Sequence, residues 1–197
     1  MTTTIYLVRH GEVHNPEGTL YGRLPNFGLS VKGKQQLEKT AEYLKDKQIS
    51  KIYASPLQRA RESAEIIRNK LKLPETSISE EILEVRTSYQ GGKFNALDPL
   101  QSEVYLKPLH PTDETIKQIA ARMQKFINRL VQTNPGKNIA VVSHGDPIVI
   151  LKTAIQNKEL SFHIFKTNEY IKHGEVYEIT SDDKNNLSVK SVFTPKV

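Results

Sequence analysis

Histidine and arginine side chains follow three short apolar runs in the sequence. The stretches that carry them are Arg9-His10-Gly11-Glu12, Ser55-Pro56-Leu57-Gln58-Arg59-Ala60 and Ser143-His144-Gly145-Asp146. A neutral imidazole is a nucleophile near pH 7, and a guanidinium group is always charged and matches phosphate oxygens with its planar fork. Helices that start after such turns add free backbone N–H groups. The combination predicts a pocket for an anion, sized for a phosphoryl group.

Phosphoryl transfer needs two further functions besides a nucleophile. A second imidazole, when protonated, donates a hydrogen bond where charge develops on the transferring group. A leaving alkoxide also needs a proton, so a carboxylic acid is expected nearby. Glu84, which follows the short apolar pair Ile82-Leu83, is the best candidate for this acid.

Apolar periodicity predicts the elements that must position these side chains. Short apolar runs at 5–8, 52–54 and 139–142 are typical of buried strands, and residues 176–179 and 187–193 are typical of a closing hairpin. Apolar residues at helical spacing predict helices over about 33–47, 60–71, 116–130 and 148–155. We expect Ser30 near the start of the first helix, and Thr112 or Asp113 as N-cap of the third.

Strands that alternate with helices predict an α/β fold, with a mainly parallel central sheet covered on both faces. Such folds bind ligands beyond the carboxyl ends of their strands, so the three stretches should meet at one edge of the sheet. The length of 197 residues predicts a single domain over 1–197. The segment at about 89–111 fits neither period and is expected to form an inserted loop or lid.

Composition excludes several classes of protein. The chain has no cysteine, which excludes a disulfide scaffold, a Cys-ligated zinc site and thiol catalysis. A net charge of +6 favours anionic partners, but the lysines are scattered without a dense stripe, so we expect no nucleic-acid partner. No apolar run approaches the roughly 20 residues of a membrane span, and no basic segment followed by an apolar run opens the chain. We therefore expect no membrane partner and a cytoplasmic location.

Several blocks of the chain resemble the histidine phosphatase superfamily, also called phosphoglycerate mutase-like. The similarity runs in order along most of the sequence. Its blocks are Arg9-His10-Gly11-Glu12, Gly22-Arg23, Leu29-Ser30 with Gly33 and Gln36, Ile52–Ala60 with Ser63-Ala64, Glu114-Thr115 with Arg122, and Val142-Ser143-His144-Gly145. The resemblance implies a three-layer α/β/α sandwich, which agrees with the periodicity.

The resemblance also implies roles for individual residues. His10 would be the nucleophile that becomes phosphohistidine, and Glu84 the proton donor that later activates water. Arg9, Arg59 and His144 would hold the phosphoryl oxygens. No metal or organic cofactor is implied.

Two departures from the family pattern affect the binding residues. Asn15, a phosphate-binding candidate, stands five residues after His10, where the family often has an asparagine at six. Residues 85–91 replace the Gly-aromatic-Glu-Gly stretch that commonly follows the acid, and this marks Arg86 and Tyr89 as possible specificity residues. Tyr21 and Arg23 are further substrate-binding candidates. In another branch an Asp directly after the second histidine is the acid. Here Gly145 stands between His144 and Asp146, which leaves Asp146 as the runner-up donor.

The preferred interpretation is a phosphatase that hydrolyses a small phosphorylated metabolite. A cofactor-dependent phosphoglycerate mutase is one alternative, disfavoured because residues 90–111 contain Lys93 and Lys107 but no Arg-Arg pair. A phosphoprotein phosphatase, including one for phosphohistidine, is the other. The oligomeric state stays open, a homodimer being one alternative.

Overall fold

A six-stranded sheet forms the centre of the molecule. The computed structural model describes residues 2–93, 105, 108–161, 164, 170–182 and 186–197. The strands are β1 (Thr4–Arg9), β2 (Ile49–Ala54), β3 (Thr76–Ile78), β4 (Asn138–Ser143), β5 (Val176–Ser181) and β6 (Leu187–Phe193). Their order across the sheet is β3-β2-β4-β1-β5-β6. The first four strands in this order are parallel, whereas β5 is antiparallel to both β1 and β6.

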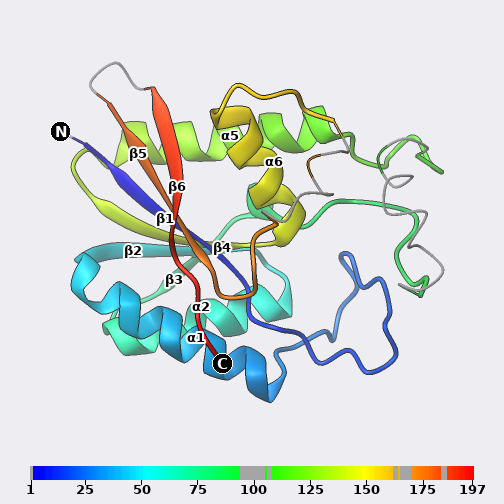
Figure 1. Ribbon diagram of the computed structural model, residues 1–197, viewed down its shortest axis with the longest axis horizontal. Coiled ribbons are helices and arrows are strands. Elements are labelled where there is room, and N and C mark those ends of the chain that lie inside the picture. Colours follow the sequence, from blue (N-terminus) through cyan, green and yellow to red (C-terminus); the bar gives the residue numbers. More distant parts are fainter. Residues whose placement is uncertain (1, 94–104, 106–107, 162–163, 165–169, 183–185) are drawn as a thin grey trace.

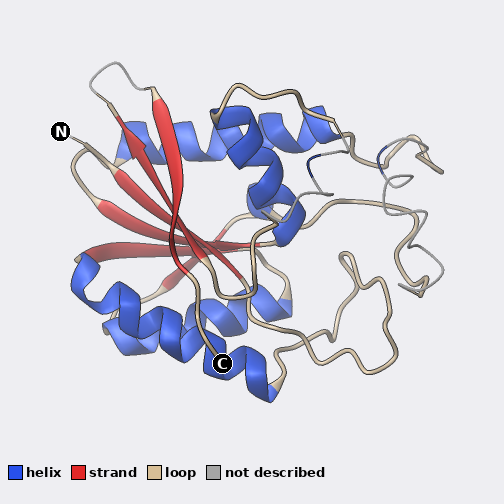
Figure 2. Ribbon diagram, in the orientation of Figure 1, coloured by secondary structure: helices blue, strands red, loops and turns tan. Residues whose placement is uncertain are grey.

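Helices cover both faces of this sheet (Figures 1 and 2). One layer contains α1 (Val31–Leu44) and α2 (Gln58–Leu71), and the other contains α5 (Ile116–Thr133) and α6 (Gly145–Ile155). Two short 3-10 helices, η1 (Lys45–Lys47) and η2 (Glu80–Ile82), complete the described elements. The expected three-layer α/β/α sandwich with a mainly parallel sheet is confirmed.

The alternation of side chains along the central strands divides the core in two. In β1, Ile5 and Leu7 belong to the apolar cluster under α5 and α6, while Tyr6 and Val8 belong to the cluster under α1 and α2. β4 alternates in the same way. Because successive strand residues point to opposite faces, a continuous apolar run fits a strand that is buried on both sides.

Local hydrogen bonds mark the starts of two helices, α1 and α5. Ser30 caps α1, where its side chain accepts a hydrogen bond from the amide of Gly33, as the sequence predicts. The prediction of Thr112 or Asp113 for α5 is wrong, because Thr115 caps that helix in a reciprocal capping box with Gln118. The Asp113 carboxylate instead accepts hydrogen bonds from Ser88 in the loop after Glu84.

Two further features of the structure differ from the sequence prediction, and a third predicted feature lies mostly outside the described residues. Strand β3 was not predicted, since three residues are too short to show a period. Helix α6 begins at Gly145, directly after β4, rather than near residue 148. Most of the expected insertion at 89–111 lies outside the described residues, which resume at 105 and 108. Among the described helices, none combines the length and the apolar character of a transmembrane span.

Candidate active site

His10 lies at the carboxyl end of β1, in the centre of the sheet, and its side chain is buried. Its Nδ1 is 2.7 Å from the carbonyl oxygen of Gly11, and its Nε2 accepts a hydrogen bond from Arg59 Nε at 3.3 Å. A carbonyl oxygen can only accept, so Nδ1 carries the proton and the lone pair resides on Nε2. Burial, followed by the charges of Arg59 and Arg9, holds the His10 pKa well below 6.5. The imidazole is therefore neutral at physiological pH.

Arg59 is fully buried, which is rare for arginine and requires partners. It is the second residue of α2, the helix that follows β2. Its Nη2 donates to the carbonyl oxygen of Gly22 at 2.8 Å and lies 4.0 Å from Glu84 Oε2. The guanidinium carbon also lies 4.6 Å from the centre of the Tyr21 ring. These contacts fix a cation beside the lone pair of His10.

His144 caps α6 and is also fully buried, with its ring centre 5.2 Å from that of His10. Its Nε2 is 2.7 Å from the Ser55 hydroxyl. When that hydroxyl donates to Nε2, the proton of the neutral ring resides on Nδ1. Nδ1 has no hydrogen-bond partner among the described residues, and neither has the buried Nε of Arg9. Both nitrogens are therefore available to a phosphoryl oxygen.

Arg9 is held from the antiparallel side of the sheet. Its Nη1 donates to the carbonyl oxygen of Ile171 at 2.7 Å, and its guanidinium carbon lies 5.2 Å from the centre of the Tyr170 ring. The backbone amide of Gly174 donates to the carbonyl oxygen of Arg9. The loop before β5 therefore helps to position the arginine that precedes the nucleophile candidate.

Glu84 follows η2 and places a carboxyl group against the two histidines. Its Oε1 accepts from the amide of Val85 at 2.9 Å, and its Oε2 lies 3.9 Å from His144 Nδ1. Burial raises the Glu84 pKa to about 7, with the charge of Asp146 as the next cause, while Arg59 lowers it. A carboxyl group that titrates near neutral pH can both give and take a proton there.

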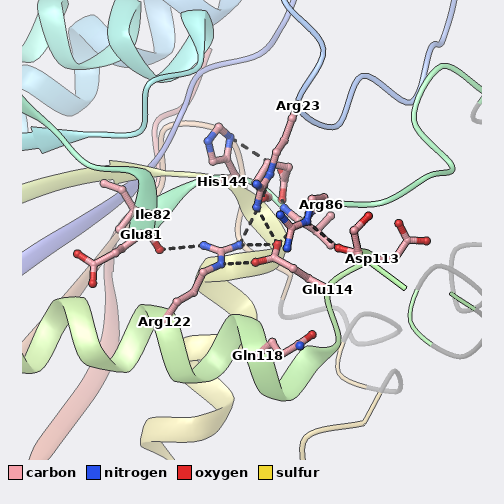
Figure 3. Close-up of polar contacts among 12 residues, drawn as sticks. Arg23, Glu81, Ile82, Arg86, Asp113, Glu114, Gln118, Arg122 and His144 are labelled. Atoms are coloured by element: carbon pink, nitrogen blue, oxygen red, sulfur yellow. Dashed lines mark hydrogen bonds and ion pairs between the residues drawn. The ribbon is translucent and has the colours of Figure 1, made fainter. Parts of the chain in front are cut away.

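A clamp of three side chains holds the backbone at Glu84. Its members Arg23, Glu114 and Arg122 are labelled in Figure 3. Arg23 Nε and Arg122 Nη2 donate to the carbonyl oxygen of Glu84 at 2.8 and 3.3 Å. Both guanidinium groups pair with the carboxylate of Glu114, at 2.7 Å from Arg23 Nη2 and 2.9 Å from Arg122 Nε. The clamp joins the loop at 20–24, the loop after η2 and helix α5.

The structure thus gathers six of the nine candidate side chains around one point. These are His10, His144, Glu84, Arg9, Arg59 and Tyr21. The other three make their described contacts outside this point, although Arg23 binds the backbone of Glu84. Asn15 exchanges two hydrogen bonds with the backbone of Thr19, Arg23 belongs to the clamp, and Arg86 donates through Nε to the carbonyl oxygen of Thr112. Their roles in binding remain predictions.

Sequence reasoning missed four residues at this site. His173 has its ring centre 5.7 Å from that of His10, and burial lowers its pKa to about 3. Ser63 Oγ accepts from the amide of Gly11, Ser55 contacts His144, and Tyr170 lies against Arg9. The serines stand inside the motif blocks quoted above and could have been found there. No sequence motif around His173 or Tyr170 identifies them as site residues, because it is the pairing of β5 with β1 that places them near His10 and Arg9.

The charge around the histidines favours an anion. Ligand-type atoms of His10, Glu84 and His144 lie within 4.8 Å of one another, a spacing that a metal ion could also bridge. Arg59 donates directly to His10 Nε2, and the charge of Arg9 also lowers the His10 pKa. A dication would face both guanidinium groups, whereas a phosphoryl group would be attracted to them. We therefore do not assign these residues as metal ligands.

Fold and side chains together define a class of protein: an α/β enzyme that handles a phosphoryl group with histidine and arginine at the carboxyl ends of its strands. The family model described as the histidine phosphatase superfamily (branch 1) matches residues 5–191, and the chain belongs to this superfamily.

Individual relatives agree with this assignment. The chain is 35% identical over 164 residues to the protein Rv0525 of Mycobacterium tuberculosis, covering 80% of this chain and 81% of the relative. It is 30% identical over 154 residues to the uncharacterized phosphatase PhoE of Bacillus subtilis, covering 78% and 77%. The solved structure of Bacillus stearothermophilus YhfR superposes with a TM-score of 0.83 at 25% identity, covering 96% of each chain. The chain is thus a phosphoric monoester hydrolase.

Proposed function

We propose that this enzyme hydrolyses a small phosphomonoester without a metal ion, through a phosphohistidine on His10. The observation that carries the proposal is the geometry at His10. A neutral imidazole with its lone pair on Nε2 accepts a hydrogen bond from Arg59, directly follows Arg9 in the chain, and has its ring centre 5.2 Å from that of His144. A nucleophile, charge stabilisation and a proton donor are the functions that such a reaction needs.

The first half of the proposed reaction transfers the phosphoryl group. As the phosphoryl oxygens attract the Arg59 guanidinium, Nε2 of His10 is freed and attacks phosphorus, and the bond from phosphorus to the ester oxygen breaks. Glu84 gives its proton to that oxygen, which leaves as an alcohol. Arg9, Arg59 and the Nδ1 proton of His144 offset the charge on the phosphoryl oxygens.

In the second half, water attacks the phosphorus of phosphohistidine. Glu84, now a carboxylate, takes a proton from this water, and the nitrogen–phosphorus bond breaks. Inorganic phosphate leaves, and His10 and Glu84 return to their starting protonation states. The guanidinium groups supply the positive charge that a metal ion supplies in other phosphatases, which supports metal independence.

Burial supports a small substrate. His10 is 1% exposed, and Arg59 and His144 are fully buried, so the ester must reach inward from the edge of the sheet. Chains with the same fold are named glucosyl-3-phosphoglycerate phosphatase (mycobacterial) and phosphoserine phosphatase (Entamoeba histolytica), and both names refer to small phosphomonoesters. We propose a substrate of this size rather than a phosphoprotein.

Trapping the covalent intermediate tests the proposal. Wild-type enzyme is mixed with p-nitrophenyl phosphate and quenched in alkali, and the peptide that contains His10 is analysed by mass spectrometry for one added phosphoryl group. His10→Ala should abolish both the adduct and hydrolysis, whereas His14→Ala, at an exposed histidine in the next loop, should retain both. Hydrolysis by His10→Ala at the wild-type rate would refute the nucleophile assignment. Rapid interconversion of phosphoglycerates that outpaces hydrolysis would favour the mutase.

A further inference from the structure

Arg9 directly precedes the nucleophile candidate, and two consecutive residues before β5 hold its guanidinium group. Arg9 Nη1 donates to the carbonyl oxygen of Ile171 at 2.7 Å, and the guanidinium carbon lies 5.2 Å from the centre of the Tyr170 ring. That distance is within the range of a cation–π contact. The buried Nε of Arg9 has no hydrogen-bond partner among the described residues. The cation is therefore fixed from one side, and its Nε is available to a ligand.

The Tyr170 ring is in turn held by the first turn of helix α6. Its hydroxyl donates to Asp146 Oδ1 at 2.5 Å, and Asp146 is the second residue of that helix. Burial raises the pKa of Tyr170 well above its usual value, so the phenol keeps the proton that it donates. Gly145, the first residue of α6, lies so close that a Cβ atom there would overlap the Tyr170 hydroxyl oxygen. The start of α6 is thus shaped to receive this hydroxyl.

The Asp146 side chain is fixed by a second contact as well. The Tyr105 hydroxyl donates to Oδ2 at 2.6 Å, so each carboxyl oxygen accepts one short hydrogen bond. Two donors from separate segments of the chain hold the orientation of the carboxyl group. They therefore also fix the point to which the Tyr170 hydroxyl is attached.

We propose that Asp146 and Tyr170 are positioning residues for Arg9: Asp146 anchors the Tyr170 hydroxyl, and the anchored ring holds the guanidinium group where the phosphoryl group binds. The inference rests on the proposed function, in which Arg9 binds that group. Neither residue touches the substrate in this scheme. Asp146, which the sequence leaves as the runner-up proton donor, therefore has a different role.

Arginine benefits from such support because its side chain has many rotamers, and ordering them on binding costs conformational entropy. A guanidinium group that is already held in the free enzyme avoids much of this cost. The support also crosses the sheet, because Asp146 belongs to the helix after β4, whereas Tyr170 precedes β5, and these two strands flank β1. The contacts thus connect Arg9 to the helix that His144 caps.

Binding of inorganic phosphate, measured as competitive inhibition of p-nitrophenyl phosphate hydrolysis, tests the proposal without a chemical step. Tyr170→Phe keeps the ring and removes its anchor, so the inhibition constant should rise roughly threefold to tenfold, as for the loss of one hydrogen bond. Tyr170→Leu also removes the aromatic face and should raise it further. Asp146→Ala should raise it at least as much as Tyr170→Phe. Asp146→Asn keeps one acceptor oxygen and should have a smaller effect than Asp146→Ala.

A double-mutant cycle with Arg9→Ala separates positioning from a purely structural role. If Tyr170 acts through Arg9, Tyr170→Phe should change the inhibition constant by less than about twofold once the guanidinium group is absent. Tyr43→Phe is the matched control, because the Tyr43 ring on α1 also lies beside a cation, with Lys47 Nζ 4.8 Å from its centre. It should leave phosphate binding unchanged in both backgrounds. Urea unfolding identifies variants that lose the fold, and if Asp146→Ala is one of them, Asp146→Asn and Tyr170→Phe provide the measurement.

Three results would overturn the inference. Unchanged phosphate binding in Tyr170→Phe and in the folded Asp146 variants would show that the anchor does not support Arg9. An equal rise with and without Arg9 would mean that Tyr170 acts by another route. Loss of alkyl ester hydrolysis in Asp146→Asn, with p-nitrophenyl phosphate hydrolysis and phosphate binding retained, would make Asp146 the proton donor. Failure of the proposed function is distinguishable, because then His10 would carry no phosphoryl group in the wild-type enzyme.

Discussion

The Glu114 carboxylate can be neutralised with little change of shape by Glu114→Gln. Its Oε2 accepts hydrogen bonds from Arg23 at 2.7 Å, from the amide of Arg86 at 2.8 Å and from Arg122 at 3.2 Å, while Oε1 accepts one from Arg122 at 2.9 Å. Glutamine replaces one of these oxygens by an NH2 group, which then faces a donor. In either orientation at least one charge-assisted hydrogen bond is lost, and two guanidinium groups lose their counter-ion.

The expected magnitude follows from burial. The Glu114 side chain is 10% exposed, and those of Arg23 and Arg122 are 22% and 16% exposed, so solvent replaces the lost partner poorly. Removal of one partner of a buried ion pair lowers the free energy of unfolding by about 3–5 kcal/mol. Because this pair is partly exposed, we expect a loss of about 3 kcal/mol. For a chain of this size that corresponds to a fall in Tm of roughly 6–12 °C. Urea and thermal unfolding, followed by circular dichroism, measure both values.

A matched control is Glu81→Gln. Glu81 pairs with Arg129 at the surface, where the Arg129 side chain is 46% exposed. An exposed pair of this kind contributes about 1 kcal/mol or less. A free energy of unfolding that falls no further in Glu114→Gln than in Glu81→Gln would refute the energetic reasoning.

The same variant also tests the clamp's link to catalysis. Because Arg23 and Arg122 both donate to the Glu84 carbonyl oxygen, a loosened clamp should misplace the Glu84 carboxyl group. We expect kcat for an alkyl phosphomonoester to fall roughly tenfold more than kcat for p-nitrophenyl phosphate. An equal fall for both substrates would mean that the clamp supports only the fold.

Three further predictions concern the chemistry and the pH dependence of stability. Glu84→Gln should slow alkyl phosphomonoesters by about 10²–10⁴-fold in kcat/KM and p-nitrophenyl phosphate far less, and equal slowing would move the acid role elsewhere. Dialysis against EDTA should leave the rate of p-nitrophenyl phosphate hydrolysis unchanged, whereas a loss restored by a divalent cation would contradict metal independence. The free energy of unfolding should fall as pH decreases from 6.5 toward 5, because the unfolded chain protonates three imidazoles that stay neutral in the native state, those of His10, His144 and His173. The raised pKa of Glu84 acts in the opposite sense between about 4.5 and 7, so the net difference approaches two protons near pH 5, where the slope reaches roughly 3 kcal/mol per pH unit. A flat profile in urea unfolding would contradict the buried neutral histidines.

The sequence predicts the strand ends well because the side chains that mark them are local. A buried parallel strand is a continuous apolar run, and Arg9, Arg59 and His144 stand just beyond three such runs. The fold follows from the alternation of these runs with helical periodicity. The short β3 and the early start of α6 carry no clear period, so their bounds come only from the structure.

Other parts of the site depend on contacts between distant segments. Arg23 was predicted to bind substrate, but its described partners are Glu114 and the backbone of Glu84, in segments that the local sequence cannot join. His173 and Tyr170 precede a strand that the pattern assigns only to a closing hairpin. Antiparallel pairing of β5 with β1 places both beside the arginine and histidine at the end of β1.

The central place of β1 in the sheet has a consequence for biosynthesis. This strand precedes both of its sheet neighbours in the chain, because Thr4 pairs with Asn138 on one side and with Thr180 on the other. An apolar strand therefore stays unpaired until most of the chain has been made. Contacts between residues so far apart in sequence slow folding, and the exposed strand favours aggregation of the nascent chain. Arg59, Glu84 and His144 precede the segment that holds His173 and β5, so a nascent chain that stops before this segment holds the nucleophile candidate with only part of its surroundings.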